Sequence, residues 1–437
     1  MKRYNLLLLL ILFIQTSLAF CENNIPVNIT EDFNKAANHH KGMFKSLMGM
    51  RGFPSLKDRS ATLDNILNKL ASYEKPTTLL FYENNENELR IWTLNNNRQV
   101  NLKKIQISSS DLEQKIIGFR KTINSLSSQI DRAPKLKRGI TRNAKKVNKT
   151  SLDEISQLLV PEELHKILDN TEQLLIIPSS AIGSIPFAML DFPGKDGKQL
   201  VDSVSITILP SLFDTDNALP RRYVSTNNHN TSLIVGNPEF YNDSDWHFPQ
   251  LPGAEHEARI VSKYLNSSPL TGSNANKSDV LKTIETADII YFATHGVASV
   301  DSPLDESFIA LAGTDFKSSR LTAREIQNLS LQAKLVVLSA CQTGLGKTED
   351  AGIIGLARAF KIAGAEEVLV SLWNVDDEVT TELMTSFMKT YLESTENASS
   401  ALRTTMAMMR TKHKDPRLWA SFTVFSGEGT VIEQTDN

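Results

Sequence analysis

A mainly parallel β-sheet with helices on both faces is the fold that the sequence predicts for residues 232–427. In this region short apolar segments of strand length alternate with amphipathic segments of helical period. Several of the short segments carry almost no polar residue, as in residues 335–339, which is typical of strands buried on both faces. The class is therefore α/β, preceded by a smaller α+β half at residues 77–213 and a short helical segment at residues 25–75.

The size and charge of the chain restrict its domains and partners. A length of 437 residues usually corresponds to two or three domains, and 41% hydrophobic and 22% charged residues are ordinary values for a globular protein. The net charge of −3 favours neither a nucleic-acid partner nor an anionic membrane. The basic stretch at residues 135–149 is either an interaction patch or a solvated loop, and the absence of aromatic residues from it favours the loop.

The first residues read as a secretory signal peptide over residues 1–19. A positively charged start precedes an unbroken apolar run at residues 6–14, and Ser17 and Ala19 supply the small residues of a cleavage site. The run is shorter than the about 20 residues of a membrane-spanning helix. We therefore expect a secreted or periplasmic protein with no integral membrane segment after signal removal, and an uncleaved N-terminal anchor is the alternative.

The first half of the chain contains the signals of a small α+β unit. Apolar residues between positions 60 and 70 recur with a helical period, so residues 25–75 are expected to be helical. Two strand-like runs flank the turn residues 84–87 and predict a β-hairpin. The elements expected here are strands at 77–82, 89–94 and 173–177, helices at 109–124 and from 151 through 168, and a closing block at 182–190.

A polar linker at residues 214–231 separates this unit from the α/β domain, and a tail follows at residues 428–437. Strands are expected where apolar residues run without interruption, and helices where apolar residues recur every three or four positions. Gly364 is a typical helix terminator. The strands expected in this domain lie at 232–235, 288–293, 308–311, 335–339, 367–373 and 419–425. The helices expected lie at 253–265, 278–286, 323–329, 353–363, 379–391 and 399–409.

Two reactive residues stand at the ends of predicted strands. His295 follows the strand at 288–293, and Cys341 follows the strand at 335–339. If these strands are neighbours in a parallel sheet, both side chains emerge at the same edge, where ligands bind in such sheets. Their separation, 341 − 295 = 46 residues, is close to the roughly 50 residues between the caspase histidine and cysteine. A cysteine at the end of an apolar strand is, taken alone, more often an inert core thiol.

Cysteine usage supports a chemical interpretation of this thiol. The chain has two cysteines, Cys21 and Cys341, so no disulfide framework is being built. A lone thiol in an exported protein then needs a reason, which is either burial or chemistry. Gly296 directly after His295 allows close approach of the backbone to a ligand, and its N–H together with that of Cys341 would form an oxyanion hole.

The two motifs resemble those of CHAT domains, which are caspase-like, separase-related cysteine peptidases often joined to helical repeats. The histidine motif is Tyr-Phe-Ala-Thr-His-Gly at residues 291–296, and the cysteine motif is Leu-Ser-Ala-Cys-Gln-Thr-Gly at residues 338–344. Leu-Pro-Gly-Ala-Glu at 251–255, the helix between Gly352 and Gly364, and Trp-Ala-Ser-Phe at 419–422 are also similar to the family. The chain departs from it in lacking the repeat array and in carrying an export signal.

This resemblance implies a caspase-like fold and a cysteine endopeptidase with Cys341 as nucleophile and His295 as proton acceptor and donor. It also implies a substrate-binding segment after the strand at 367–373. The predicted substrate-binding residues are Trp373, Asn374, Asp377 and, more weakly, Asp350. The resemblance to separases implies cleavage after Arg or Lys, with Asp377 pairing the basic side chain. The alternative role for Asp377 is to cap the helix that begins there.

Two other readings stay open beside the peptidase. One is a catalytically silent CHAT scaffold that binds proteins, because a fold can be retained after catalytic activity has been lost. The other is a different acyl-transfer enzyme that uses the same dyad. The partners expected are a protein or peptide substrate and a regulatory protein, with no nucleic acid. The pair His39-His40 has no further ligand at metal spacing, so we expect neither a metal nor another cofactor.

Overall fold

The computed structural model describes residues 26–47, 61–124, 149–212, 231–243, 246–299, 302, 304–339, 351–373, 377–394 and 397–427. Four sequence-based predictions fall on residues that lie wholly or largely outside these ranges. They are the signal peptide at 1–19, the basic stretch at 135–149, the linker at 214–231 and the tail at 428–437.

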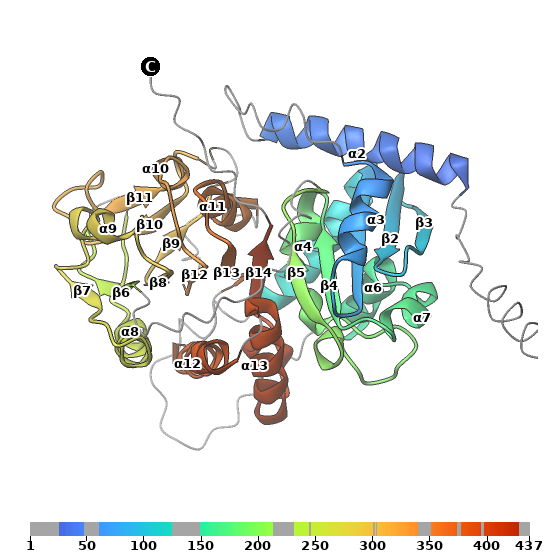
Figure 1. The fold of residues 1–437 in the computed structure, drawn as a ribbon. Helices are drawn as coiled ribbons and strands as arrows, with labels where there is room; N and C mark the ends of the chain where they lie inside the picture. The colour runs from blue at the N-terminus through green and yellow to red at the C-terminus, as the bar shows by residue number, and fades with distance from the viewer. Residues whose placement is uncertain are drawn as a thin grey trace, which may run out of the picture.

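One mixed sheet runs through both halves of the chain (Figure 1). Among the described residues it has eleven strands, in the order β3-β2-β1-β4-β5-β14-β13-β12-β8-β6-β7. The strands of the first half are β1 (Thr77–Asn85), β2 (Glu88–Asn95), β3 (Val100–Gln106), β4 (Gln173–Ile177) and β5 (Ser205–Ile208). Those of the second half are β6 (Ser232–Pro238), β7 (Leu270–Gly272), β8 (Ile289–Ala293), β12 (Leu335–Leu338), β13 (Glu367–Ser371) and β14 (Phe422–Ser426).

Helices cover both faces of the sheet in the second half (Figure 1). On one face lie α8 (Pro252–Tyr264), α12 (Asp377–Glu393) and α13 (Ala398–Lys412). On the other lie α9 (Lys277–Thr283), α10 (Ala323–Gln327) and α11 (Ala351–Ile362). Because β6, β8, β12 and β13 are parallel neighbours, the prediction of a mainly parallel α/β sheet covered on both faces is confirmed.

The sheet in the first half is also packed on both faces, and its strands show why. Leu79 and Phe81 of β1 belong to a core shared with α2 (Val27–Leu47) and α3 (Leu63–Ala71). Leu80 and Tyr82, which point the opposite way, belong to the main core, which α4 (Ser109–Asn124) and α6 (Lys149–Leu159) complete. The central strand β4 is therefore a nearly continuous apolar run, as expected for a strand that is covered on both faces.

Several elements differ from the sequence-based expectation. The helix expected from residue 151 through 168 ends at Leu159, because Pro161 cannot donate a backbone hydrogen bond, and it is followed by a 3-10 turn and α7 (His165–Leu168). The strand expected at 419–425 begins only at Phe422 and is antiparallel to β13. The edge strand β3, whose residues alternate between half-buried and exposed, and the four-residue β5 were not predicted.

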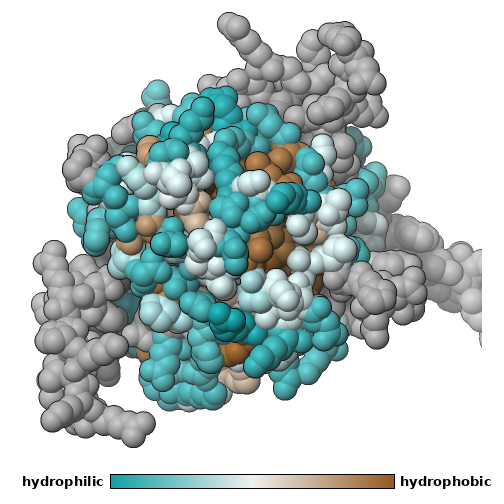
Figure 2. Space-filling model, turned by 90° about the vertical axis from the view of Figure 1, so that its left-hand side faces the viewer, coloured by the Kyte–Doolittle hydropathy of each residue, from teal (hydrophilic) through white to brown (hydrophobic). Residues whose placement is uncertain are grey.

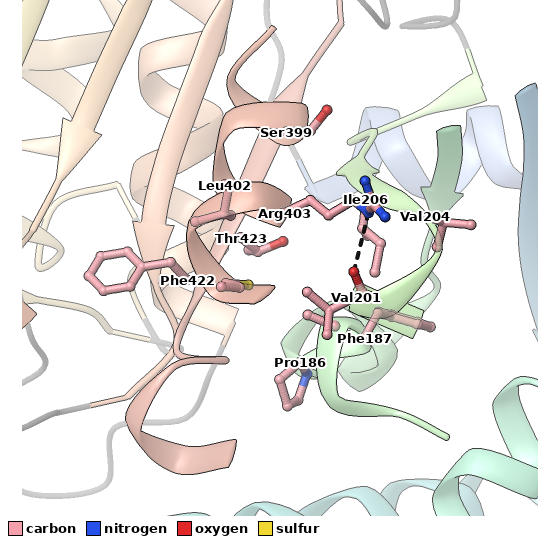
Figure 3. Close-up of a pocket in the computed structure, with 12 residues that line it drawn as sticks. Pro186, Phe187, Val201, Val204, Ile206, Ser399, Leu402, Arg403, Phe422 and Thr423 are labelled. Atoms are coloured by element: carbon pink, nitrogen blue, oxygen red, sulfur yellow. Dashed lines mark hydrogen bonds between the residues drawn. The ribbon is translucent and has the colours of Figure 1, made fainter. Parts of the chain in front are cut away.

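The two halves meet where β5 pairs in parallel with β14. Helix α13 also reaches across this junction, because Arg403 donates to the carbonyl oxygens of Val201 at 3.2 Å and Asp202 at 3.0 Å. Beside it lies a small, partly open and mostly apolar hollow, lined among others by Pro186, Val201, Leu402 and Phe422 (Figure 3). It contains none of the residues predicted to form the active site.

The end of the molecule that carries β7 is mostly hydrophilic, with hydrophobic side chains emerging in small patches (Figure 2). The edge strand β7 has only three residues, so it offers little backbone for pairing with another chain. None of the helices in the described ranges combines the length and the hydrophobicity needed to cross a bilayer.

Candidate active site

The predicted histidine lies at the edge of the sheet where three parallel strands end. In the register of β8, β12 and β13, Phe292 pairs with Leu338, and Leu338 pairs with Val370. Because these strands are parallel, they end at one common edge of the sheet. His295 lies at this edge, three positions after Phe292. Cys341, Asp350 and Asn374 lie outside the described residues, and their roles stay predictions.

The imidazole of His295 is buried and held in one orientation. Only 3% of the residue is exposed, and its ring packs against Phe240 at 4.7 Å and Phe248 at 5.3 Å, measured between ring centroids. Its Nε2 is 2.7 Å from the carbonyl oxygen of Pro249. A carbonyl only accepts, so Nε2 carries the proton and donates it, and Nδ1 of the neutral ring remains as the proton acceptor.

A small second sheet fixes the backbone around this histidine. It consists of β9 (Gly296–Val297), β10 (Phe308–Ala310) and β11 (Arg320–Thr322). Ala310 N–H donates to the carbonyl of His295 at 2.9 Å, and the register pairs Gly296 with Ile309. In an antiparallel ladder this bond flanks a non-hydrogen-bonded pair, so the N–H of Gly296 points away from β10. The N–H of Gly296, which is a predicted oxyanion-hole donor, is therefore not used in the pairing of β9 with β10.

We expect His295 to titrate below the ordinary histidine range. Burial of the ring lowers its pKa from 6.5, and the hydrogen bond to Pro249 opposes part of this shift. The folded protein thus favours the neutral ring, and its stability falls as the pH drops below 6.5, because the histidine of the unfolded chain then takes up a proton more readily than the buried ring does. An NMR titration of the histidine Cε1–H resonances measures this pKa, with His295→Ala identifying the resonance. A midpoint above 6.5 contradicts the expectation.

A buried carboxylate that the sequence analysis did not single out lies behind β8. Glu257 of α8 is 2% exposed, and Oε1 accepts a hydrogen bond of 2.7 Å from the hydroxyl of Tyr291, which is fully buried. Burial and the nearby carboxylate raise the pKa of Tyr291, so the phenol stays protonated and donates. The signal was present in the sequence, since Glu257 lies within the buried stripe of α8 beside Ala258 and Val261.

Removing this carboxylate is expected to destabilise the protein. Glu257→Ala leaves the Tyr291 hydroxyl without this acceptor and opens a cavity, at a cost of about 2–4 kcal/mol in the free energy of unfolding. Glu257→Gln keeps the shape and an acceptor oxygen and is expected to cost less than half as much. Urea unfolding of the two variants and the wild type measures the difference. Equal losses for Ala and Gln contradict a role for the hydrogen bond.

The end of β13 is rigidly held. Trp373 is 4% exposed, and its indole Nε1 donates to the carbonyl oxygen of Arg417 at 3.0 Å. One residue earlier, Leu372 N–H donates to the carbonyl of Ser421 at 2.6 Å. Helix α12 begins at Asp377, whose side chain is not described. The buried indole leaves little surface for direct substrate contact, so the predicted binding role of Trp373 would be exerted mainly by shaping the segment after it.

The described residues contain no group of three or more His, Cys, Asp or Glu side chains able to hold a metal ion. His40 is therefore not part of a metal-binding group among these residues. Burial and the charge of Arg358 lower its pKa to about 4, and its ring centroid lies 5.3 Å from that of Phe81.

The model of one protein family matches residues 149–428, and that family is the CHAT domain. The chain belongs to the CHAT domain family. The match includes the strand edge and His295, and it begins after α4. The membership confirms the resemblance drawn from the histidine and cysteine motifs.

Two curated relatives share part of this CHAT protein. Tetratricopeptide repeat protein 28 of Mus musculus is 27% identical in an alignment 297 residues long that covers 59% of this chain and 12% of the mouse protein. The protein of the same name from Homo sapiens is 28% identical over 297 residues, with the same shares. The chain thus spans about an eighth of the length of these relatives.

Two solved structures show a distant likeness. The Saccharomyces cerevisiae separase–securin complex has a TM-score of 0.49 and 13% identity, over 83% of this chain and 31% of that one. The complex of Porphyromonas gingivalis RgpB pro- and mature domains has a TM-score of 0.40 and 12% identity, over 71% of this chain and 77% of that one.

Proposed function

We propose that this CHAT protein is a cysteine endopeptidase that cleaves peptide bonds with His295 and Cys341. The observation that carries the proposal is the orientation of His295, whose Nε2–H donates to Pro249 while Nδ1 is left to accept a proton. A neutral imidazole with a lowered pKa suits a base that takes the thiol proton during attack. The parallel pairing of β8 with β12, the strand that leads toward Cys341, supports the same assignment.

The reaction would proceed by acyl transfer. The Cys341 thiol gives its proton to Nδ1 of His295, and the sulfur attacks the scissile carbonyl carbon. The imidazolium then returns that proton to the leaving amine as the C–N bond breaks, which leaves a thioester. Water, deprotonated by the same imidazole, hydrolyses the thioester and restores the thiol. The backbone N–H of Gly296 and of Cys341 would stabilise the oxyanion, by about 3–4 kcal/mol per donor.

Cleavage of an unbiased peptide library by the wild type and by Cys341→Ala tests this function. We expect defined cleavage products from the wild type, none from the variant, and covalent labelling of the wild type at Cys341 by a thiol-reactive peptide probe. Cleavage by both proteins would exclude Cys341 as the nucleophile. A wild type that neither cleaves nor labels would instead favour the silent scaffold.

The same library tests the substrate class. We propose a basic residue before the cleaved bond, paired by Asp377, and a protein or peptide substrate reached by export through residues 1–19. Asp377→Asn removes the negative charge with little change in shape, so the preference for Arg and Lys over Ala is expected to fall about tenfold or more. Equal cleavage of Arg and Ala substrates by the wild type would remove this part of the proposal.

A further inference from the structure

A buried arginine from the first half of the chain reaches the active-site edge of the second half. Arg120 lies on α4, outside the residues that the CHAT model matches, and is 3% exposed. An arginine is buried this deeply only when its donors find acceptors, because desolvating the guanidinium is costly.

Two hydrogen bonds of Arg120 join segments that lie far apart in the chain. Nη2 donates to the carbonyl oxygen of Leu372 at 2.6 Å, and Nη1 donates to the carbonyl oxygen of Ser184 at 3.1 Å. The guanidinium carbon also lies 5.8 Å from the centroid of the Trp373 ring. Residues 120 and 372 are 252 positions apart, so this contact exists only in the folded assembly of both halves.

These contacts act on the strand end that precedes the predicted substrate-binding segment. Leu372 is held through its N–H by Ser421 and through its carbonyl by Arg120, and Trp373 is held through its indole by Arg417. Asn374, the next residue, is a predicted substrate-binding residue. The direction in which the chain leaves β13 is thus set partly by Arg120, a residue of the first half of the chain.

We propose that Arg120 is a positioning residue for the peptidase, and that the first half of the chain completes the active site by fixing the end of β13. This inference rests on the proposed peptidase function. Arginine suits the role because its planar guanidinium donates to both carbonyls at once and stacks near an indole. A lysine keeps the charge but not this fork, and a methionine keeps only the length and the apolar stem.

The experiment compares Arg120→Lys, Arg120→Met and a matched control, Arg403→Met. Arg403 also donates to two backbone carbonyls across the halves, but it does so beside the hollow between α13 and β5 (Figure 3). Two quantities are measured in each protein. One is amide hydrogen exchange of peptides covering residues 367–373, and the other is kcat/KM with kcat and KM separated.

We expect Arg120→Met to speed exchange in residues 367–373 about tenfold or more and to lower kcat/KM about 10- to 100-fold, mainly by raising KM. Arg120→Lys should fall between it and the wild type. Arg403→Met should leave both quantities near wild type. Labelling of Cys341 by iodoacetamide, which needs no substrate groove, should be unchanged in all of them.

Unchanged exchange in both Arg120 variants, or an equal change in Arg403→Met, would overturn the positioning role. Faster exchange with an unchanged kcat/KM would overturn its link to the reaction. If the wild type has no peptidase activity, the proposed function fails, while the exchange data still decide whether Arg120 holds the strand end. Arg120→Lys, the mildest change, keeps the test available if Arg120→Met does not fold.

Discussion

Replacing His295 with alanine is expected to lower kcat/KM for peptide cleavage by about 10²–10⁴-fold. In the proposed mechanism the imidazole accepts the thiol proton and donates it to the leaving amine, and general acid–base catalysis typically supplies a factor of this size. Initial rates on the best peptide found in the library give the ratio. The effect should lie mainly in kcat, since the ring acts on the transition state more than on substrate binding.

The control for this variant is His256→Ala, which removes an exposed histidine from α8. It should keep wild-type kcat/KM. Circular dichroism is needed for His295→Ala, because the buried ring packs against Phe240 and Phe248. A folded His295→Ala protein that retains more than a tenth of the activity would contradict the assigned role.

Trp92→Ala is expected to cause the largest loss of stability, about 3–5 kcal/mol in the free energy of unfolding. Trp92 of β2 is fully buried, and its ring meets Phe33 of α2 edge-on at a centroid distance of 5.2 Å. Its Nε1 donates to a carboxylate oxygen of Glu83 at 3.4 Å. The substitution therefore opens a cavity between the sheet and α2. Urea or thermal unfolding measures the loss.

Tyr264→Ala provides the comparison, because this aromatic side chain at the end of α8 is 43% exposed. It should change the free energy of unfolding by no more than about 0.5 kcal/mol. Trp92→Phe, which refills part of the cavity, should recover about half of the loss. A Trp92→Ala protein as stable as Tyr264→Ala would mean that α2 contributes nothing to the core.

The strands that were predicted well are those that burial makes unambiguous. β8, and β4 after its first residue, are hydrophobic without interruption because both of their faces are covered, and this leaves a continuous signal in the sequence. β3 has only half-buried and exposed residues, and polar residues at positions 101, 103, 104 and 106 interrupt its apolar ones, so its pairing with β2 decides its conformation. The end of α6 is set by a local signal, because Pro161 stops the helix that the apolar period alone would extend to residue 168.

For the site, the sequence indicated His295 and the edge of the sheet on which it lies, because a residue that directly follows a buried parallel strand must lie where that strand ends. The groups that orient it were not predictable. Pro249 contacts the ring from 46 residues away, through a carbonyl that any residue type has. Arg120 was equally hidden, because its helical segment shows nothing unusual and its acceptors are backbone oxygens from distant parts of the chain.

The position of β14 has a consequence for biosynthesis. It is the last strand of the described chain, yet it lies inside the sheet between β5 and β13, with partners on both sides. During translation one edge of β5 and one edge of β13 therefore stay unpaired until residues 422–426 leave the ribosome. The strand end beside the active-site edge acquires its Ser421 partner only then, so a ribosome-bound chain that stops before residue 421 is expected to be inactive.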